Sequence, residues 1–251
     1  MALSERGLSD RTRCGDRGGL PVMILGVRIS AFLRSFAVQG SWNYRSVLGS
    51  GFAFSLIPFL RRHDLSSDEL EATLRRHLEP FNSHPYLVGV ALGAVARMEE
   101  RREAPEVIRK FKEAIRGSLG SLGDSLVWGA WRPTTLLLGL LIAWAGAPPW
   151  ISVTVFLIVY NAGHLALRYW SLHLGLAEGR EVGRSLGEMD LSHVAGRIRS
   201  GGTLLLGILS GALLGSYLMG ANAGWLWGAV GIAGFGLGHR FGARAFKRKG
   251  A

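Results

Sequence analysis

Cysteine is almost absent from this 251-residue chain, which has a single one, Cys14. One thiol excludes an intrachain disulfide framework and a cysteine-based metal cage. No Ser-His-Asp order, reactive cysteine or paired acids with plausible geometry stands out either. The sequence therefore predicts a protein with no catalytic centre of its own and no metal or other cofactor.

Acidic residues are scarce relative to basic ones. The chain has 18 Asp and Glu against 29 Lys and Arg, a formal net charge of +11. The positive charges are scattered through segments that flank apolar stretches, so they do not form a nucleic-acid recognition element. Because 48% of the residues are hydrophobic and 36 are glycines, a membrane protein with basic cytoplasmic loops explains this charge better.

Long apolar runs are confined to the C-terminal half. Four approach the roughly 17–25 residues that a spanning helix needs, at about 134–149, 150–167, 203–219 and 222–238. Uncharged connections at 147–150 and 219–224 pair them into two hairpins, and the opposite ends are basic. The positive-inside rule places those basic ends, including the tail 239–251, in the cytoplasm. We expect 134–238 to form a transmembrane helical scaffold in an all-α, polytopic integral membrane protein.

The N-terminal half differs in kind. Residues 1–19 have no apolar core and predict a disordered tail. In 20–133 glycines and prolines interrupt short apolar pieces, which favours broken or re-entrant helices around a site. Two polar segments predict helices: one capped by Ser66 or Ser67, and an amphipathic one over 99–117.

The stretch "VQGSWNYRSVLGSGFAF" (38–54) places amides and an indole among apolar residues. In a helix, Gln39 and Asn43 would share one face, with Trp42 beside it. Two amides and an aromatic ring suit a sugar, which needs hydrogen bonds for its hydroxyls and a flat surface for its C–H face. The alternative is that these residues only hold helices together.

Three other segments have polar groups that could serve a site. "GSLGSLGDSLVWGAWRP" (117–133) lacks the Gly-Lys-Ser/Thr of a phosphate loop, so we expect a hairpin there, with Asp124 as a helix N-cap or a substrate ligand. His77, Glu79, Asn82 and His84 fall around two prolines, which disrupts metal-ligand spacing. His164 and Arg168 lie near a basic helix end, where snorkelling to lipid headgroups is the ordinary explanation.

Taken together, several blocks resemble the IID membrane component of the mannose/fructose/sorbose family of bacterial sugar phosphotransferase systems. They are "QGSWNY" (39–44), "GFAFSLIP" (51–58), "RRHLEPFNSHPY" (75–86), "MEE" (98–100), "GSLGSLGDSLVWGAWRP" (117–133) and "YNAGHLALRYWSLHLG" (160–175). Their order and spacing match the family over roughly residues 30–180. The chain departs from the pattern at Arg45, where an acidic residue is usual, and at Leu48, where a glutamine is usual.

The resemblance implies a multi-pass subunit of the bacterial inner membrane that carries a hexose together with a second membrane protein, IIC. The phosphoryl group comes from phosphoenolpyruvate through the soluble carriers IIA and IIB, and IIC–IID units form multimers. Expected substrate-binding residues are Gln39, Trp42, Asn43, Arg45, Asn82 and Asp124. The alternative is a diverged IID-like subunit that no longer transports and instead has an interaction or regulatory role.

Overall fold

The computed structural model describes residues 20–63, 65–219, 228–229 and 232, and these residues form helices joined by turns. The chain divides into two compact units, unit 1 (Met1–Pro80) and unit 2 (Phe81–Ala251). The expected tails 1–19 and 239–251 lie outside the described residues, as does nearly all of the fourth apolar stretch, 222–238.

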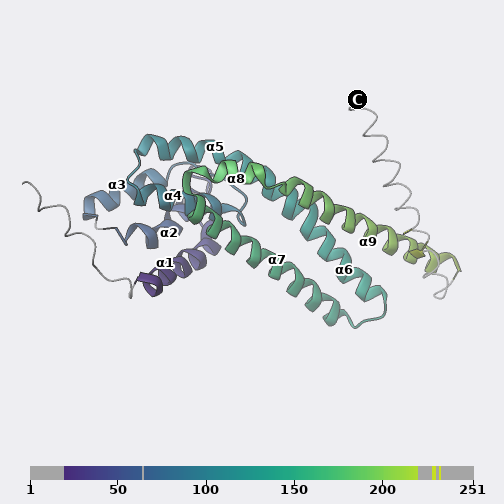
Figure 1. Cartoon of the computed structure of the whole chain (residues 1–251). Coiled ribbons are helices and arrows are strands. Elements are labelled where there is room, and N and C mark those ends of the chain that lie inside the picture. The colour runs from purple at the N-terminus through teal and green to yellow at the C-terminus, as the bar shows by residue number, and fades with distance from the viewer. Residues whose placement is uncertain (1–19, 64, 220–227, 230–231, 233–251) are drawn as a thin grey trace, which may run out of the picture. The chain divides into compact units, whose positions relative to one another are not determined.

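Unit 1 is built from α1 (Leu20–Ser35), the 3₁₀ helix η1 (Phe36–Gln39), α2 (Gly49–Leu60) and α3 (Ser67–His77). Helices α1 and α2 lie side by side (Figure 1). A Cβ on Gly51 would lie 2.4 Å from the backbone oxygen of Val38, so glycine permits this close approach. The predicted start of α3 is confirmed, because Ser66 and Glu69 form a capping box.

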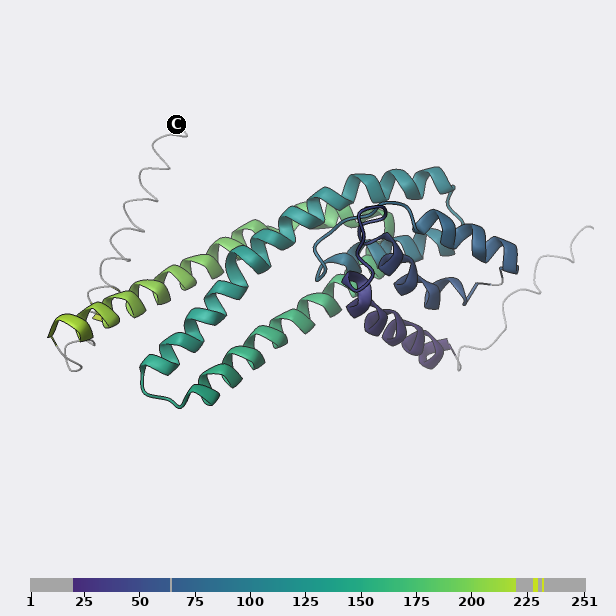
Figure 2. The same ribbon diagram turned by 180° about the vertical axis from the view of Figure 1, so that it is seen from behind.

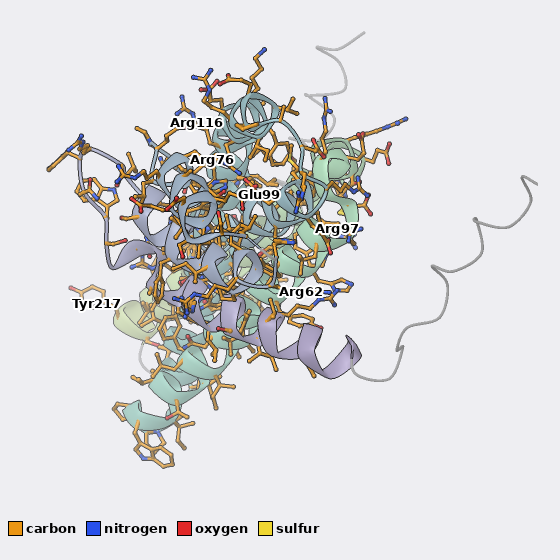
Figure 3. All side chains as sticks on the ribbon, turned by 90° about the vertical axis from the view of Figure 1, so that its left-hand side faces the viewer. Arg62, Arg76, Arg97, Glu99, Arg116 and Tyr217 are labelled. Carbon is orange, nitrogen blue, oxygen red and sulfur yellow. The ribbon has the colours of Figure 1, made fainter. Side chains whose placement is uncertain are left out.

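Unit 2 begins with α4 (Val88–Glu100) and α5 (Pro105–Gly123), continues through η2 (Asp124–Trp131), α6 (Arg132–Trp144) and α7 (Pro149–Glu178), and ends with η3 (Gly179–Glu181), α8 (Val182–Glu188) and α9 (Leu191–Met219). Helices α6 and α7 form a hairpin, and α9 runs beside α6 (Figures 1 and 2). The side-chain view labels Arg97 and Glu99 on α4, Arg116 on α5 and the outward-pointing Tyr217 on α9 (Figure 3).

Three helical segments are long and apolar enough to cross a membrane: Pro105–Trp144, Pro149–Glu188 and Leu191–Tyr217. The first contains residues 134–144 of the predicted stretch 134–149, the second contains all of 150–167, and the third contains nearly all of 203–219. Three of the four expected spanning helices are therefore confirmed as helices. The predicted first hairpin is confirmed too, with Gly146 at φ +93° in its turn. Large apolar side chains such as Leu140, Trp150 and Ile158 are exposed, as a lipid-facing surface requires.

The expected hairpin at 117–133 is wrong. Helices α5, η2 and α6 form one continuous helical segment from Pro105 to Trp144, and the backbone of Asp124 is helical (φ −61°, ψ −44°), so Asp124 is not an N-cap. Gly123 serves packing instead: a Cβ at this position would lie 2.1 Å from the Cβ of His84. The sequence-based boundary at residue 133 falls inside this continuous helix.

The amphipathic helix expected over 99–117 exists, but it begins at Pro105. Helix α4 continues to Glu100, and Arg102 then adopts φ +53°, which ends the helical path. Ile108 and Ile115 are buried on the predicted apolar face, and Lys112 is buried between them.

Small residues allow α4 and α7 to pack at backbone distance. A Cβ on Gly89 would lie 2.4 Å from Ser171 Oγ, one on Gly93 2.5 Å from Leu176 N, and one on Gly175 2.2 Å from Val90 O. The spacing on each helix is small-xxx-small, which brings membrane helices into close contact. This contact fixes the segment that precedes α4, where part of the candidate site lies.

Candidate functional site

The first group of polar residues lies in unit 1, in residues 40–48, which we call the aromatic loop. Asn43 organises this loop with its side-chain amide. Its Oδ1 accepts from the backbone N–H groups of Arg45 (3.0 Å) and Ser46 (2.9 Å). Its Nδ2 donates to Ser41 O (3.0 Å) and to Ser46 Oγ (2.8 Å). An amide has two acceptor and two donor positions, so all four are used inside the loop.

The backbone closes the same loop. Asn43 and Val47 exchange hydrogen bonds, with N–O distances of 3.3 Å from Asn43 N to Val47 O and 2.8 Å from Val47 N to Asn43 O. Val47 has φ +56°, which is strained for a β-branched residue. Such strain persists only where surrounding contacts determine the backbone, and it is concentrated at functional sites. The loop is therefore held in one particular conformation.

The helical arrangement expected for Gln39, Trp42 and Asn43 is wrong. Gln39 ends the short helix η1, and the chain turns before Asn43, because the Asn43 side chain bonds to its own loop instead of leaving the backbone helical. The residues are not buried in this chain: Gln39, Trp42, Asn43 and Arg45 are all exposed. Tyr44, 93% exposed, packs edge-on against Trp42 with ring centroids 4.8 Å apart. The loop thus presents two aromatic rings beside an amide and a guanidinium.

The second group lies in unit 2 and is a cluster of rings around one arginine. We call it the ring cluster; its members are His84, Tyr86, Trp128, Tyr160, His164 and Arg168. Tyr86 is at its centre, with its hydroxyl 2.7 Å from that of Tyr160 and its ring stacked on His164 at 3.8 Å. The guanidinium of Arg168 lies 5.5 Å from the centroid of the same ring.

Arg168 does not snorkel to lipid headgroups, contrary to the expectation from sequence. Its side chain is buried, and Arg168 Nε donates to His164 Nε2 at 3.3 Å. The reason is the Tyr86 ring, which offers its π face to the cation within about 6 Å and replaces part of the lost hydration. Tyr86, Trp128 and Tyr160 were missed by the sequence interpretation, and no local pattern signals them, because Tyr86 and Tyr160 are 74 positions apart.

His84 is almost completely buried against Gly123, with its ring against Tyr86 and Trp128. Its Nδ1 accepts from the backbone N–H of Tyr86 at 3.2 Å, and its Nε2 has no hydrogen-bond partner in the structure. Burial lowers the pKa of His84 to about 4, and the nearby carboxylate of Asp124 opposes this shift. His84 is therefore neutral at physiological pH.

The remaining predicted site residues, Asn82 and Asp124, belong to unit 2 and are exposed. Asp124 is the first residue of η2 and lies within electrostatic reach of His84, beside the ring cluster. The structure thus brings Trp42, Asn43 and Arg45 together in the aromatic loop, just after Gln39. In the described ranges no three His, Cys, Asp or Glu side chains gather in a way that would hold a metal ion.

Residues 26–219 match the model of the mannose/fructose/sorbose family IID component of the phosphotransferase system. The chain belongs to this family. Over 192 residues it is 32% identical to the mannose-specific EIID component of Escherichia coli K12, covering 74% of this chain and 66% of that one. It is 33% identical over 202 residues to the sorbose-specific EIID component of Klebsiella pneumoniae, covering 78% and 68%.

Two solved structures support the fold of this IID component. One is the complex of the mannose transporter ManYZ with microcin E492, with 30% identity, a TM-score of 0.58, and coverage of 74% of this chain and 69% of that one. The other is described only as a membrane protein, with 25% identity, a TM-score of 0.66, and coverage of 90% and 89%. The all-helical, membrane-spanning architecture expected from sequence is thus confirmed.

Proposed function

We propose that this chain is the IID subunit of a phosphoenolpyruvate-dependent, mannose-type sugar phosphotransferase system. It forms the hexose translocation unit with a IIC subunit across the bacterial inner membrane. IIA and IIB carry the phosphoryl group, and the chain itself performs no phosphoryl transfer. Family membership supports the proposal, as does the membrane transporter complex among its structural relatives.

The observation that carries the substrate part of the proposal is the aromatic loop. Its amide Asn43 is saturated by bonds within the loop, so its role is to hold Trp42 and Tyr44 in place. Two exposed rings at an edge-on angle offer flat apolar surface for the C–H face of a sugar, and Gln39 and Arg45 supply hydrogen bonds to hydroxyls. Asn82 and Asp124 are separate, exposed polar candidates within unit 2.

Arg45 donates hydrogen bonds and accepts none, so it favours ligand groups that offer lone pairs. Hexose hydroxyls can do so, since each hydroxyl oxygen accepts as well as donates. We assign to Arg45 a part in selecting among hexoses, because it is exposed and follows Tyr44 directly in the aromatic loop.

The test is uptake of a labelled hexose panel by vesicles that contain the chain with its co-expressed IIC, IIB and IIA. Trp42→Ala should abolish uptake by removing a stacking surface, and Asn43→Ala should do so by releasing the loop. Asn43→Asp keeps an acceptor for the N–H groups of Arg45 and Ser46, so it should retain more uptake than Asn43→Ala.

Glu113→Ala, on the exposed side of α5, is the matched control and should leave uptake unchanged. Full uptake in both Trp42→Ala and Asn43→Ala would remove the aromatic loop from the sugar path. An assembled wild-type complex that neither binds nor imports any hexose would favour the alternative, a IID-like subunit with an interaction or regulatory role.

A further inference from the structure

The segment η2 (Asp124–Trp131) is a π-helix inside the continuous helical segment Pro105–Trp144. Its backbone hydrogen bonds join residues five positions apart, as from Arg132 N to Val127 O, where an α-helix would join residues four positions apart. A π turn contains one more residue than an α-helical turn, so it rotates the following helix by one residue position, about 100°, relative to the preceding one. Such turns are rare and occur frequently at functional sites.

Pro133 explains why the helix departs from α geometry at this point. In an α-helix the carbonyl oxygen of Gly129 would accept from the N–H of residue 133. Proline has no N–H, and its ring collides with the carbonyl group four residues earlier. Pro133 therefore disfavours the α-helical register and leaves Gly129 O without its α-helical donor.

A donor for this carbonyl comes from α9, which lies against η2. Arg199 Nε donates to Gly129 O at 3.4 Å, and Arg199 Nη2 donates to Ser125 Oγ at 3.1 Å. The two acceptors belong to residues four positions apart, so one guanidinium connects the first and the second half of η2. Thr134 Oγ1 also donates to Ile198 O at 3.2 Å, which joins α9 to the first turn of α6.

The register of η2 matters because contacts on both of its sides form together. Gly123, directly before η2, packs against His84, and the Trp128 ring lies 5.4 Å from the His84 ring between their centroids. At the other end, Trp131 Nε1 donates to Tyr160 O on α7 at 3.2 Å. A change of one residue position inside η2 would turn one of these two faces away from its partner. The π turn thus aligns the face on the ring cluster with the face on α7.

We propose that Arg199 is a positioning residue that holds η2 in the π register. It thereby keeps Trp128 against the ring cluster and Asp124 exposed beside it. Pro133 makes the α-helical register unfavourable, and the two hydrogen bonds from Arg199 stabilise the π register. The inference depends on the contacts within unit 2 and does not rest on sugar transport.

The test uses a Pro133→Ala background, in which the backbone can adopt either register. Alanine supplies the missing N–H and is strongly favoured over proline inside a helix, so this variant should fold. The readout is the rate of maleimide labelling of a single cysteine, placed in turn at positions 126, 127, 128 and 129 on a Cys14→Ser background. In the π register the first two positions are buried and the last two are exposed. Pro133→Ala alone should keep this labelling pattern, because Arg199 still holds η2.

Arg199→Ala, added to Pro133→Ala, should let η2 become α-helical. One of the two buried positions should then become reactive and one of the two exposed positions protected. Each labelling rate should change by about tenfold or more, because a protected thiol reacts only through local opening. Arg197→Ala in the same background is the matched control, since Arg197 is exposed two residues earlier on α9 and the same charge is removed. It should keep the π pattern.

Arg199→Lys retains a cationic donor for one of the two acceptors, so it should keep the π pattern in part. A labelling pattern that Pro133→Ala alone already changes would overturn the proposal, since Arg199 would then not hold the register. So would an unchanged pattern in the Pro133→Ala, Arg199→Ala double variant. Faster labelling at all four positions of the double variant would also overturn it, because Arg199 would then support the fold in general and not one register.

Discussion

The contact between α4 and α7 gives the sharpest prediction for stability. Gly175→Ala adds a methyl group 2.2 Å from Val90 O, 2.9 Å from Val90 C and 3.0 Å from Ala94 N. All three atoms are backbone, so the clash cannot be relieved by a side-chain rotation, and the two helices must separate. Overpacking of this kind costs about 1–3 kcal/mol, and backbone obstruction favours the upper end.

The same substitution also changes helix propensity, in the opposite direction. Alanine is favoured over glycine in a helix interior by about 1 kcal/mol. The net expectation for Gly175→Ala is therefore a loss of about 1–2 kcal/mol in the free energy of unfolding. Gly120→Ala, inside the continuous helical segment from Pro105 to Trp144 and with nothing within 4 Å of its added methyl, is the matched control. It should gain up to about 1 kcal/mol.

The assay is unfolding of the purified protein in mixed detergent micelles with increasing sodium dodecyl sulfate, followed by circular dichroism. The two variants should differ by about 2–3 kcal/mol, since propensity is common to both and only packing distinguishes them. Equal unfolding free energies would refute the close contact between α4 and α7. In the double variant, Gly93→Ala should lower the free energy of unfolding by less than it does alone. Its methyl would also meet Gly175, so one separation of α4 from α7 relieves both clashes.

Two further predictions concern single groups. Since the pKa of His84 is about 4 in the folded protein and 6.5 in the unfolded chain, the unfolded state binds more protons between these values. Unfolding free energy should therefore fall as the pH drops from 6.5 towards 4, by up to about 3 kcal/mol, and His84→Phe should flatten that slope in pH-dependent unfolding. Ser66→Ala removes the hydroxyl that accepts from Glu69 N at the start of α3 and should cost about 1 kcal/mol in thermal or denaturant unfolding. An unchanged midpoint would contradict the cap.

Much of the fold follows from local sequence signals. The capping box at Ser66 and Glu69 and the apolar face of Ile108 and Ile115 depend on neighbours within one or two helical turns, and both are present. The expected hairpin at 117–133 failed because its glycines read as a turn, whereas Gly123 accommodates a side chain from another segment, His84. In a sequence, a glycine that a turn requires cannot be told from a glycine that a close contact between two segments requires.

The conformation of the aromatic loop could not be predicted from the sequence, and the substrate role of its residues stays a prediction. Gln39, Trp42, Asn43 and Arg45 were expected together, and they do lie in or next to the aromatic loop. The helical spacing was wrong because the Asn43 side chain competes with the backbone for local N–H groups, as asparagine does in turns. Helical periodicity does not indicate whether an asparagine stays in a helix or bonds through its side chain to nearby backbone N–H groups.

The ring cluster explains why the spacing of residues on α7 predicted the wrong environment for Arg168. Spacing pairs it with His164, and that pair exists, but its environment is set by Tyr86 from the segment before α4. The same tyrosine contacts Tyr160, His164 and His84, so one side chain joins the start of unit 2 to two turns of α7. A charged residue in a spanning helix is costly unless its surroundings compensate for lost hydration. The close packing of Gly89, Gly93 and Gly175 supports this compensation, because it holds α4 against α7 next to Tyr86, whose carbonyl oxygen accepts from Ser171 Oγ at 3.2 Å. The glycines and the buried cation are thus one structural arrangement, and a methyl group at Gly175 should disturb both.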